Sequence, residues 1–357
     1  MKVDDGRARP RRTAVTLHDV AHEAGVSLAT ASRVLNGSHR TVAEAYRERV
    51  QAVATRLGYT ANASAQATVR GTSAVIALLV ADIADPYFGQ IASGVARAAD
   101  DAGLIVTIGI TGRDPDREVR LVRALRGQRP RGVILASSRT SDTVPTALRQ
   151  ELDAIASAGG RVVALGRGVD DVRTVLIDNV AGSRAVAAAL AHRGYRAAVI
   201  LAAHAGMRTS DERVEGFTAG FVEAGGHRPR VHRGGFTRES GERLMQQALR
   251  DGIAPGTVVF GVNDVVAIGA LAAIRAAGRT VGVDIAVAGF DDIPTSRDVT
   301  PTLTTVQVPL EAVGHTALRA AVDTEWTFDP SALALTVRLR DSTPDIAAVL
   351  RAPARRA

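Results

Sequence analysis

The chain has 357 residues, of which 46% are hydrophobic, and it contains no cysteine. This apolar fraction is typical of a folded globular protein and excludes a chain that is disordered throughout. The lack of cysteine excludes disulfides, thiolate nucleophiles and cysteine-bound metal centres. The sequence shows neither the ~18-residue apolar run of a membrane helix nor the apolar centre of a secretory signal, so we expect a cytoplasmic protein with no membrane partner.

Positive charge is concentrated near the N-terminus. Residues 1–70 carry 11 Lys and Arg against 6 Asp and Glu, which accounts for most of the net charge of +7. A small basic segment on a near-neutral body is typical of a head that binds a polyanion such as nucleic acid. A solvated basic tail, with Arg7, Arg9, Arg11 and Arg12, explains the charge equally well, so charge alone leaves both interpretations open.

The chain divides by pattern into five parts. These are a polar, basic tail over 1–14, short helices over 15–58, a linker of small polar residues over 59–72, an α/β body over 73–345 and a second tail over 346–357. In the body, apolar strands alternate with amphipathic helices, which predicts parallel sheets buried on both faces. We expect strands at 74–80, 104–109, 132–136, 161–165, 175–177, 197–201, 257–260 and 285–289. The body exceeds one typical core, so two lobes are expected.

Residues 16–37 predict a helix-turn-helix. Gly25 can adopt the positive φ of a tight turn, and the Ser27 hydroxyl can cap the second helix. With Ala31, Val34 and Leu35 packed on the first helix, other side chains face outward. The outward set is Leu28, Ala29, Ser32, Arg33 and Asn36. His18 and His22 have a spacing that can bind a metal, but no third ligand is near in sequence, and we expect neither metal nor cofactor.

The run T-L-x-D-V-A-x-x-A-G-V-S-x-x-T-x-S-R-V-L-N over residues 16–36 resembles the head of the LacI/GalR family of bacterial transcription regulators. Further matching runs are R-E-R-V at 47–50, L-G-Y at 57–59, D-P-Y-F at 85–88, R-x-x-G-F at 213–217, G-V-N-D-x-x-A-I-G-A at 261–270, V-A-G-F-D-D at 287–292 and P-T-L-T-T-V at 301–306. The resemblance covers about residues 15–343. It implies an α/β fold with a helix-turn-helix head on a periplasmic-binding-protein-like body of two lobes.

The resemblance also assigns the DNA-binding residues of the head. Leu28, Ala29 and Arg33 would read bases, with Arg33 donating to guanine in the major groove. A phosphate contact or a surface ion pair is the alternative for Arg33. The positions implied to contact phosphate or to orient the helix are Ser27, Thr30, Ser32 and Asn36.

The linker departs from the family pattern. Residues 62–70 would form a hinge helix that enters the minor groove, where a leucine wedges between bases and kinks the duplex. Thr68 occupies the leucine position, so we predict weaker DNA bending, while Asn62 and Gln66 can still reach groove edges. Ala43 replaces the serine that the family uses to cap the third helix of the head.

The resemblance implies that the chain crosses between the lobes three times. We place the first lobe at about 73–172 and 301–328, and the second at about 173–300 and 329–345. The implied effector-binding residues are Tyr87, Phe88, Ser137, Arg213, Phe236, Asn263 and Asp291. Arginine, aspartate and asparagine suit adjacent sugar hydroxyls, and phenylalanine suits the apolar face of a pyranose. Taken singly, the aromatics fit a core, Asp291 fits a helix cap, and Arg213 fits a helix surface.

Two further positions bear on the lobe junction. Asp178 matches a family position that we interpret either as supporting the pocket residues or as facing the hinge. Val308 precedes Pro309 where the family often has glutamine, which removes a polar group and changes either ligand preference or the coupling between ligand and head.

These observations predict a homodimeric, DNA-binding repressor that a small sugar-like inducer releases from a palindromic operator. A corepressor-dependent repressor is the alternative among regulators. A sugar-binding transport protein would not need the helix-turn-helix. An enzyme is not expected, because the sequence has no G-x-S-x-G, H-E-x-x-H, P-loop or strand-linked G-x-G-x-x-G motif, and we assign no catalytic residue.

Overall fold

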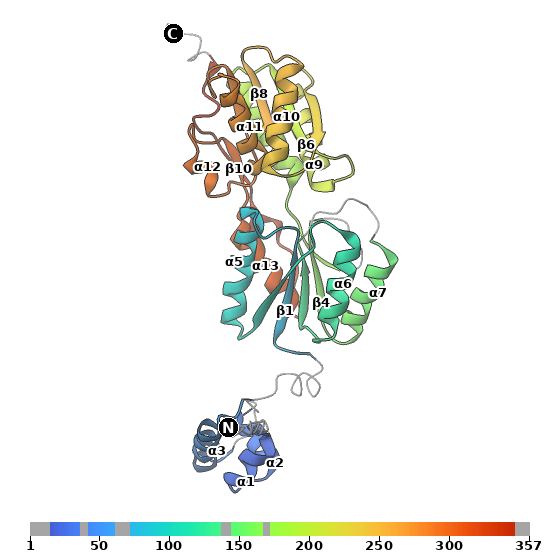
Figure 1. Cartoon of the computed structure of the whole chain (residues 1–357), viewed down its shortest axis with the longest axis vertical. Helices are drawn as coiled ribbons and strands as arrows, with labels where there is room; N and C mark the ends of the chain where they lie inside the picture. Colours follow the sequence, from blue (N-terminus) through green and yellow to red (C-terminus); the bar gives the residue numbers. More distant parts are fainter. Residues whose placement is uncertain (1–14, 36–41, 61–71, 137–143, 167–171, 347–357) are drawn as a thin grey trace, which may run out of the picture. The chain divides into compact units, whose positions relative to one another are not determined.

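The computed structural model describes residues 15–35, 42–60, 72–136, 144–166 and 172–346 (Figure 1). The chain separates into two compact units, Met1–Ser73 and Ala74–Ala357. Within the described ranges, no helix is both long enough and apolar enough to span a bilayer.

The described part of the first unit is a head of three helices, α1 (Leu17–Glu23), α2 (Leu28–Leu35) and α3 (Glu44–Leu57). Helix α1 begins in a capping box, in which the Thr16 hydroxyl accepts from the Asp19 backbone N–H and the Asp19 carboxylate accepts from the Thr16 N–H. The apolar faces of the helices meet in a small core of Val20, Ala21, Ala24, Ala31, Val50, Val53 and Ala54.

The turns of the head form as predicted. Gly25 has φ 61° between α1 and α2, and Gly58 has φ 66° after α3. The Ser27 hydroxyl accepts a 3.1 Å hydrogen bond from the Thr30 backbone N–H and so caps α2. Ala43 offers α3 no side-chain cap. Tyr59 packs against the head core, so the head extends one residue into the segment that we assigned to the linker.

The first lobe of the second unit contains one parallel sheet in the order β2-β1-β3-β4-β5. Its strands are β1 (Val75–Val80), β2 (Ile105–Ile110), β3 (Gly132–Leu135), β4 (Arg161–Leu165) and β5 (Arg173–Val175). Its intervening helices are α5 (Pro86–Asp101), α6 (Pro115–Arg126) and α7 (Thr146–Ser157). We expected a strand at 175–177, but β5 ends at Val175.

The second lobe contains a second parallel sheet in the order β7-β6-β8-β9. Its strands are β6 (Ala197–Ala203), β7 (Arg230–Gly234), β8 (Thr257–Gly261) and β9 (Ile285–Ala288). Its helices are α8 (Asn179–His192), α9 (Arg208–Glu223), α10 (Arg238–Arg250), α11 (Asp264–Ala276) and the short α12 (Thr295–Asp298). The sequence analysis did not predict β7, because this edge strand reads R-V-H-R-G and has no apolar run.

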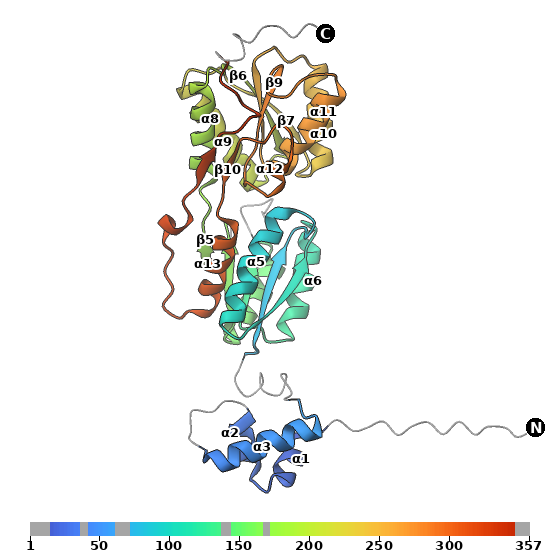
Figure 2. The ribbon, with the colours of Figure 1, turned by 90° about the vertical axis from the view of Figure 1, so that its left-hand side faces the viewer.

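The chain returns from the second lobe to the first later than expected. We placed this crossing at residue 301, but Thr304 accepts from Gly289 and bridges to Ala288, and Gln307 bridges to Asp291. Strand β10 (Thr305–Gln307) therefore lies against the second lobe, and α13 (Leu310–Val322) is the first element to rejoin the first lobe, where it packs on α5 (Figure 2).

The last crossing leads back through the 3-10 turn η1 (Pro330–Leu333) to β11 (Thr336–Arg338). Strand β11 pairs antiparallel with β10, and Ser342 then accepts from the Val287 backbone N–H in the second lobe. Ile346 donates to the Arg193 carbonyl, so the folded body continues to at least this residue. We retain the proposed division into two lobes but move two of its boundaries. Strand β5 pairs with β4 in the first lobe, so the first crossing follows Val175 and not residue 172. The second crossing lies at about residue 308.

Helices in each lobe pack in close pairs through glycine. A Cβ on Gly94 of α5 would lie 2.0 Å from the Glu311 carbonyl oxygen of α13, and one on Gly314 would lie 2.1 Å from the Ile91 oxygen. In the second lobe, Gly269 of α11 faces the Arg238 oxygen of α10 in the same way. These backbones approach so closely that only glycine fits, which fixes how the helices cover the sheets.

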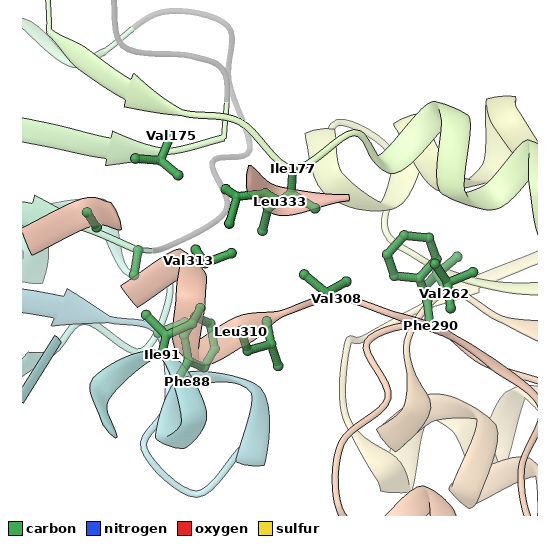
Figure 3. Close-up of a cluster of buried hydrophobic side chains, with 14 of the residues drawn as sticks. Phe88, Ile91, Val175, Ile177, Val262, Phe290, Val308, Leu310, Val313 and Leu333 are labelled. Atoms are coloured by element: carbon green, nitrogen blue, oxygen red, sulfur yellow. The ribbon is translucent and has the colours of Figure 1, made fainter. Parts of the chain in front are cut away.

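An apolar cluster joins the lobes at the crossing segments (Figure 3). Val308 lies between the two lobes, with Leu310 and Ile177 toward the first lobe and Phe290 and Val262 toward the second. Val308 is buried, so the residue in which the sequence departs from the family pattern packs as part of the junction core. The neighbouring Gln307 supplies the polar contacts there, since its amide donates to Asp292 and accepts from Arg338.

Candidate functional site

The outward face of α2 carries the residues that we predicted to read bases. Leu28 is 49% exposed, and Ala29 and Arg33 are also exposed. Leu28 lies outside the core of the head, and Arg33 forms no ion pair among the described residues. The alternative of a surface salt bridge for Arg33 therefore receives no support from the structure.

The N-terminal end of α2 presents the predicted phosphate-contacting hydroxyls. The Ser27 and Thr30 hydroxyls lie 2.8 Å apart at the helix start, where unpaired backbone N–H groups and the helix dipole favour an anion. Ser32 is half-buried on the same helix. The remaining predicted DNA-binding residues lie outside the described residues, namely Asn36, Asn62, Gln66 and Thr68.

Helix α3 supports α1 and α2 from behind. Arg56 pairs with Glu23 of α1 at 2.9 Å, and Arg49 lies over the Tyr46 ring at 5.1 Å. These cations are engaged within the head, whereas Arg33 has no ion-pair partner in the part of the chain that the structure describes.

The body holds a hollow of about 570 Å³, including space open to solvent, at the carboxyl ends of strands from both lobes. Of the expected effector-binding residues, Tyr87, Phe88, Arg213, Phe236, Asn263 and Asp291 line it. Ser137 lies outside the described residues. The lining is completed by Asp85, Arg113, Ala136, Leu165, Gly166, Ile177, Asn179, Met207 and Thr209.

Arg213 is the structural centre of this pocket. It projects from α9, is 1% exposed, and donates from Nε to Asn179 Oδ1, from Nη1 to the Val262 carbonyl and from Nη2 to Asp291 Oδ1, at 2.8–2.9 Å. Its guanidinium carbon lies 3.8 Å from the centre of the Phe290 ring. Arg213 is therefore not a surface helix residue, and its bonds fix the direction in which its other N–H groups point.

Asp291 is held in an unusual backbone conformation, with φ 115° immediately after β9. Few non-glycine residues adopt this region, and the strain places the carboxylate against Arg213 rather than at a helix start. Burial raises the pKa of Asp291 to about 7, because removal from water outweighs the attraction of Arg213.

Asn263 caps helix α11, since its Oδ1 accepts from the Val266 N–H at 2.9 Å. Its amide NH₂ is therefore the group that it can offer to the pocket. The next residue, Asp264, is fully buried and accepts from Thr305 and from the Ile293 N–H. Burial raises the pKa of Asp264 well above its usual value, and the two hydrogen bonds that it accepts hold the segment behind Asn263 in place.

Aromatic side chains form the pocket wall in the first lobe. Tyr87 and Phe88 meet edge to face with ring centres 5.0 Å apart. Phe88 is 4% exposed and belongs to the core as well as to the lining of the pocket. Asp85 caps α5 by accepting from the Tyr87 N–H, and burial raises its pKa.

The sequence analysis missed several lining residues. Asp85 stood within the quoted D-P-Y-F run, and Asn179 directly follows Asp178, which is exposed and caps α8. Arg113 follows the carboxyl end of β2. The rule that ligands bind at the carboxyl ends of parallel strands was a signal that could have found Arg113.

A second polar cluster lies beside the pocket. Asp292 is buried and accepts from Arg340, Ser296, Arg297 and Gln307. The arginine and hydroxyl partners hold the pKa of Asp292 below its usual value, against the opposing effect of burial. This cluster ties β10 and the final segment to the turn that carries Asp291.

Comparisons with known proteins match this architecture. A family model described as "Bacterial regulatory proteins, lacI family" matches residues 16–62, and one described as "Periplasmic binding proteins and sugar binding domain of LacI family" matches residues 73–327. The HTH-type transcriptional regulator CelR of Thermobifida fusca is 34% identical over 338 residues, which is 92% of this chain and 98% of that protein.

Solved structures of similar proteins cover nearly the whole chain. A crystal structure of the lac repressor dimer bound to operator and the anti-inducer ONPF superposes with a TM-score of 0.78 at 26% identity, covering 93% of this chain and 100% of that one. A complex of the transcriptional regulator CelR with cellobiose has a TM-score of 0.65 at 31% identity, covering 92% and 99%.

Proposed function

Because the chain belongs to the lacI family of bacterial regulatory proteins, we propose that it is a transcriptional repressor that a small sugar-like inducer releases from a palindromic operator. Its family consists of transcription regulators, not enzymes. The observation that carries the proposal is the pairing of an exposed recognition helix in the head with a polar pocket built by two lobes of the body. We place the protein in the cytoplasm, where operator DNA is found.

In the head, α2 enters the major groove and Arg33 reads a base edge. Leu28 and Ala29 offer only methyl groups, which suits thymine, so the polar readout falls to Arg33. Ser27, Thr30, Ser32 and Asn36 contact phosphate or orient the helix. Asn62, Gln66 and Thr68 belong to the hinge, where Thr68 in place of leucine weakens the bend in the DNA.

In the body, the pocket suits a polyhydroxylated ligand. Arg213 and the Asn263 amide donate hydrogen bonds, Asp291 accepts them, and Tyr87, Phe88 and Phe236 supply flat apolar surface. The similar CelR protein has been solved with cellobiose, which supports a sugar as the class of effector. Ser137 joins this set by its match to the family pattern.

The protein acts as a homodimer on a two-fold symmetric operator. The edge strand of the first sheet exposes apolar side chains: in β2, Ile105 is 66% and Ile108 is 43% exposed. Exposed apolar edges of this kind are normally covered by a partner. The similar lac repressor structure is a dimer, which supports a second copy of the chain as that partner.

Fluorescence anisotropy of the full chain on labelled promoter duplexes from its own gene neighbourhood tests this function. We expect tight binding to one duplex, and Arg33→Ala should weaken that binding by about 1–3 kcal/mol. Arg56→Ala is the matched control, since it removes the same charge from a residue that pairs within the head. Equal losses in the two variants would show that Arg33 contributes only charge. Adding ligand distinguishes an inducer, which weakens binding, from a corepressor, which strengthens it.

A further inference from the structure

The guanidinium of Arg113 forms part of the pocket wall where the two lobes meet. Arg113 follows β2 in the first lobe and has φ 60°, with its backbone N–H donating to the Thr111 hydroxyl. Its guanidinium carbon lies 5.5 Å from the centre of the Phe236 ring, which belongs to the second lobe. The side chain is thus held beside the cavity by an unusual backbone conformation and by a cation–π contact.

Arg113 differs from the other arginine of the pocket in its partners. Arg213 donates from Nε, Nη1 and Nη2 to protein acceptors. The Nε of Arg113 is buried without a hydrogen-bond partner, and its guanidinium forms no ion pair among the described residues. Among the described lining residues, Arg113 is therefore the cation whose charge no carboxylate pairs with, whereas Arg213 is paired with Asp291.

The carboxylates nearest to Arg113 do not neutralise it by direct contact. Asp85 accepts from the Tyr87 N–H, and Asp82 accepts from the Ala84 N–H. Burial lowers the pKa of Arg113 despite the attraction of both carboxylates. An oxyanion is the group that best satisfies such a guanidinium, because its two oxygens match the planar donor pair.

We propose that the effector is a sugar derivative that carries an oxyanion, either a carboxylate or a phosphate, and that Arg113 is the residue that selects for it. The inference rests on the proposed function and names the ligand class of the same pocket. Arg213, Asp291 and Asn263 hold the hydroxyl groups, while Arg113 receives the charged group at the opposite wall.

Calorimetric titration of the full chain with matched neutral and anionic sugars tests the proposal. The probes are D-glucose against D-glucuronate and D-glucose 6-phosphate, and cellobiose against cellobionate. The anionic member of at least one set should bind about tenfold or more tightly than the neutral one. The glucuronate and phosphate arms show which oxyanion the pocket accepts.

Arg113→Gln should remove this preference and bring the anionic sugar to the affinity of the neutral one, with the unfolding temperature measured alongside. Arg117→Gln is the matched control, because it removes an exposed arginine from the adjoining helix α6. Asp85→Asn provides an opposite test. Asparagine still caps α5, and loss of the neighbouring negative charge should tighten binding of the anionic sugar.

A neutral sugar that binds as tightly as its anionic counterpart, with Arg113→Gln having no effect on either, would overturn the inference and leave the proposed function intact. Weaker binding of the anion in Asp85→Asn would also count against it. If neither neutral nor anionic sugars bind, both the inference and sugar sensing fail.

Discussion

The head and the pocket recognise their ligands with side chains in opposite states. On α2, Leu28 and Arg33 are exposed, and Arg33 pairs with no described residue. In the pocket, Arg213 is buried and donates hydrogen bonds to the buried side chains of Asn179 and Asp291. A substitution on α2 should therefore change DNA binding alone, whereas a substitution at the centre of the pocket should change ligand binding and folding together.

The largest effect is expected from Arg213→Ala. It leaves the Asp291 carboxylate buried without its partner, which should lower the free energy of unfolding of the body by about 3–5 kcal/mol and abolish effector binding. Urea denaturation followed by calorimetry measures both losses. Arg184→Ala is the control: Arg184 pairs with Glu223 on the surface, with both side chains about half exposed, and should cost only about 0–1 kcal/mol. Equal costs for the two variants would contradict the described pocket.

A smaller loss of stability is expected from a substitution that disturbs only the packing of two helices. Gly94→Ala places a Cβ against the Glu311 carbonyl oxygen and should destabilise the first lobe by about 1–3 kcal/mol, without touching a ligand-binding side chain. Gly89→Ala, in the same helix, meets nothing within 4 Å and should be neutral or slightly stabilising. Thermal unfolding distinguishes them, and a neutral Gly94→Ala would mean that α5 and α13 do not pack as described.

The pH dependence of the free energy of unfolding tests whether the buried Asp291 carboxyl contributes to the stability of the body. The pKa of Asp291 is about 7 in the folded chain, above its value in the unfolded chain, so the folded state retains the proton longer. The resulting stability is present below pH ~4 and is lost as the pH rises toward 7. Asp291→Asn should flatten this part of the profile, as measured by urea midpoints between pH 4 and 8. If the Asp291→Asn variant keeps the same pH dependence of stability, other groups cause that dependence, and Asp264 is the first candidate.

The smallest expected effect lies in the head. Ala43 has the extended backbone of a helix cap, with ψ 138°, but no side chain that can accept a hydrogen bond. Ala43→Ser should stabilise α3 by about 1 kcal/mol, seen as slower amide exchange in its first turn. Effector affinity should not change, because Ala43 lies in the head. If Ala43→Ser changed effector affinity but not amide exchange in α3, the head and the pocket would not have separate roles.

Local signals made the head predictable from sequence. The turn at Gly25, the cap at Ser27 and the stop at Gly58 each depend on one residue and its neighbours, and the structure has all three. Strands that lie within apolar runs were also found to within a few residues. The edge strand β7 escaped because it is half-exposed and polar, so its partner β6 rather than its composition determines it.

Contacts between distant residues were less predictable. Arg213 and Asp291 lie 78 positions apart, and only the family resemblance linked them. Arg113 had no motif around it, and its role depends on the Phe236 ring from the other lobe. The crossing near residue 308 was misplaced because Thr304 and Gln307 join the second lobe by backbone pairing, which composition does not reveal.

The central claim is that ligand in the pocket and operator on the head affect each other. The direct measurement is operator affinity of the full chain with and without saturating effector, and effector affinity with and without operator duplex. We expect saturating effector to change operator affinity, and operator duplex to change effector affinity, by the same factor of about 5- to 150-fold, because coupling between two binding sites is reciprocal. Two affinities that are each unaffected by the other ligand would contradict it.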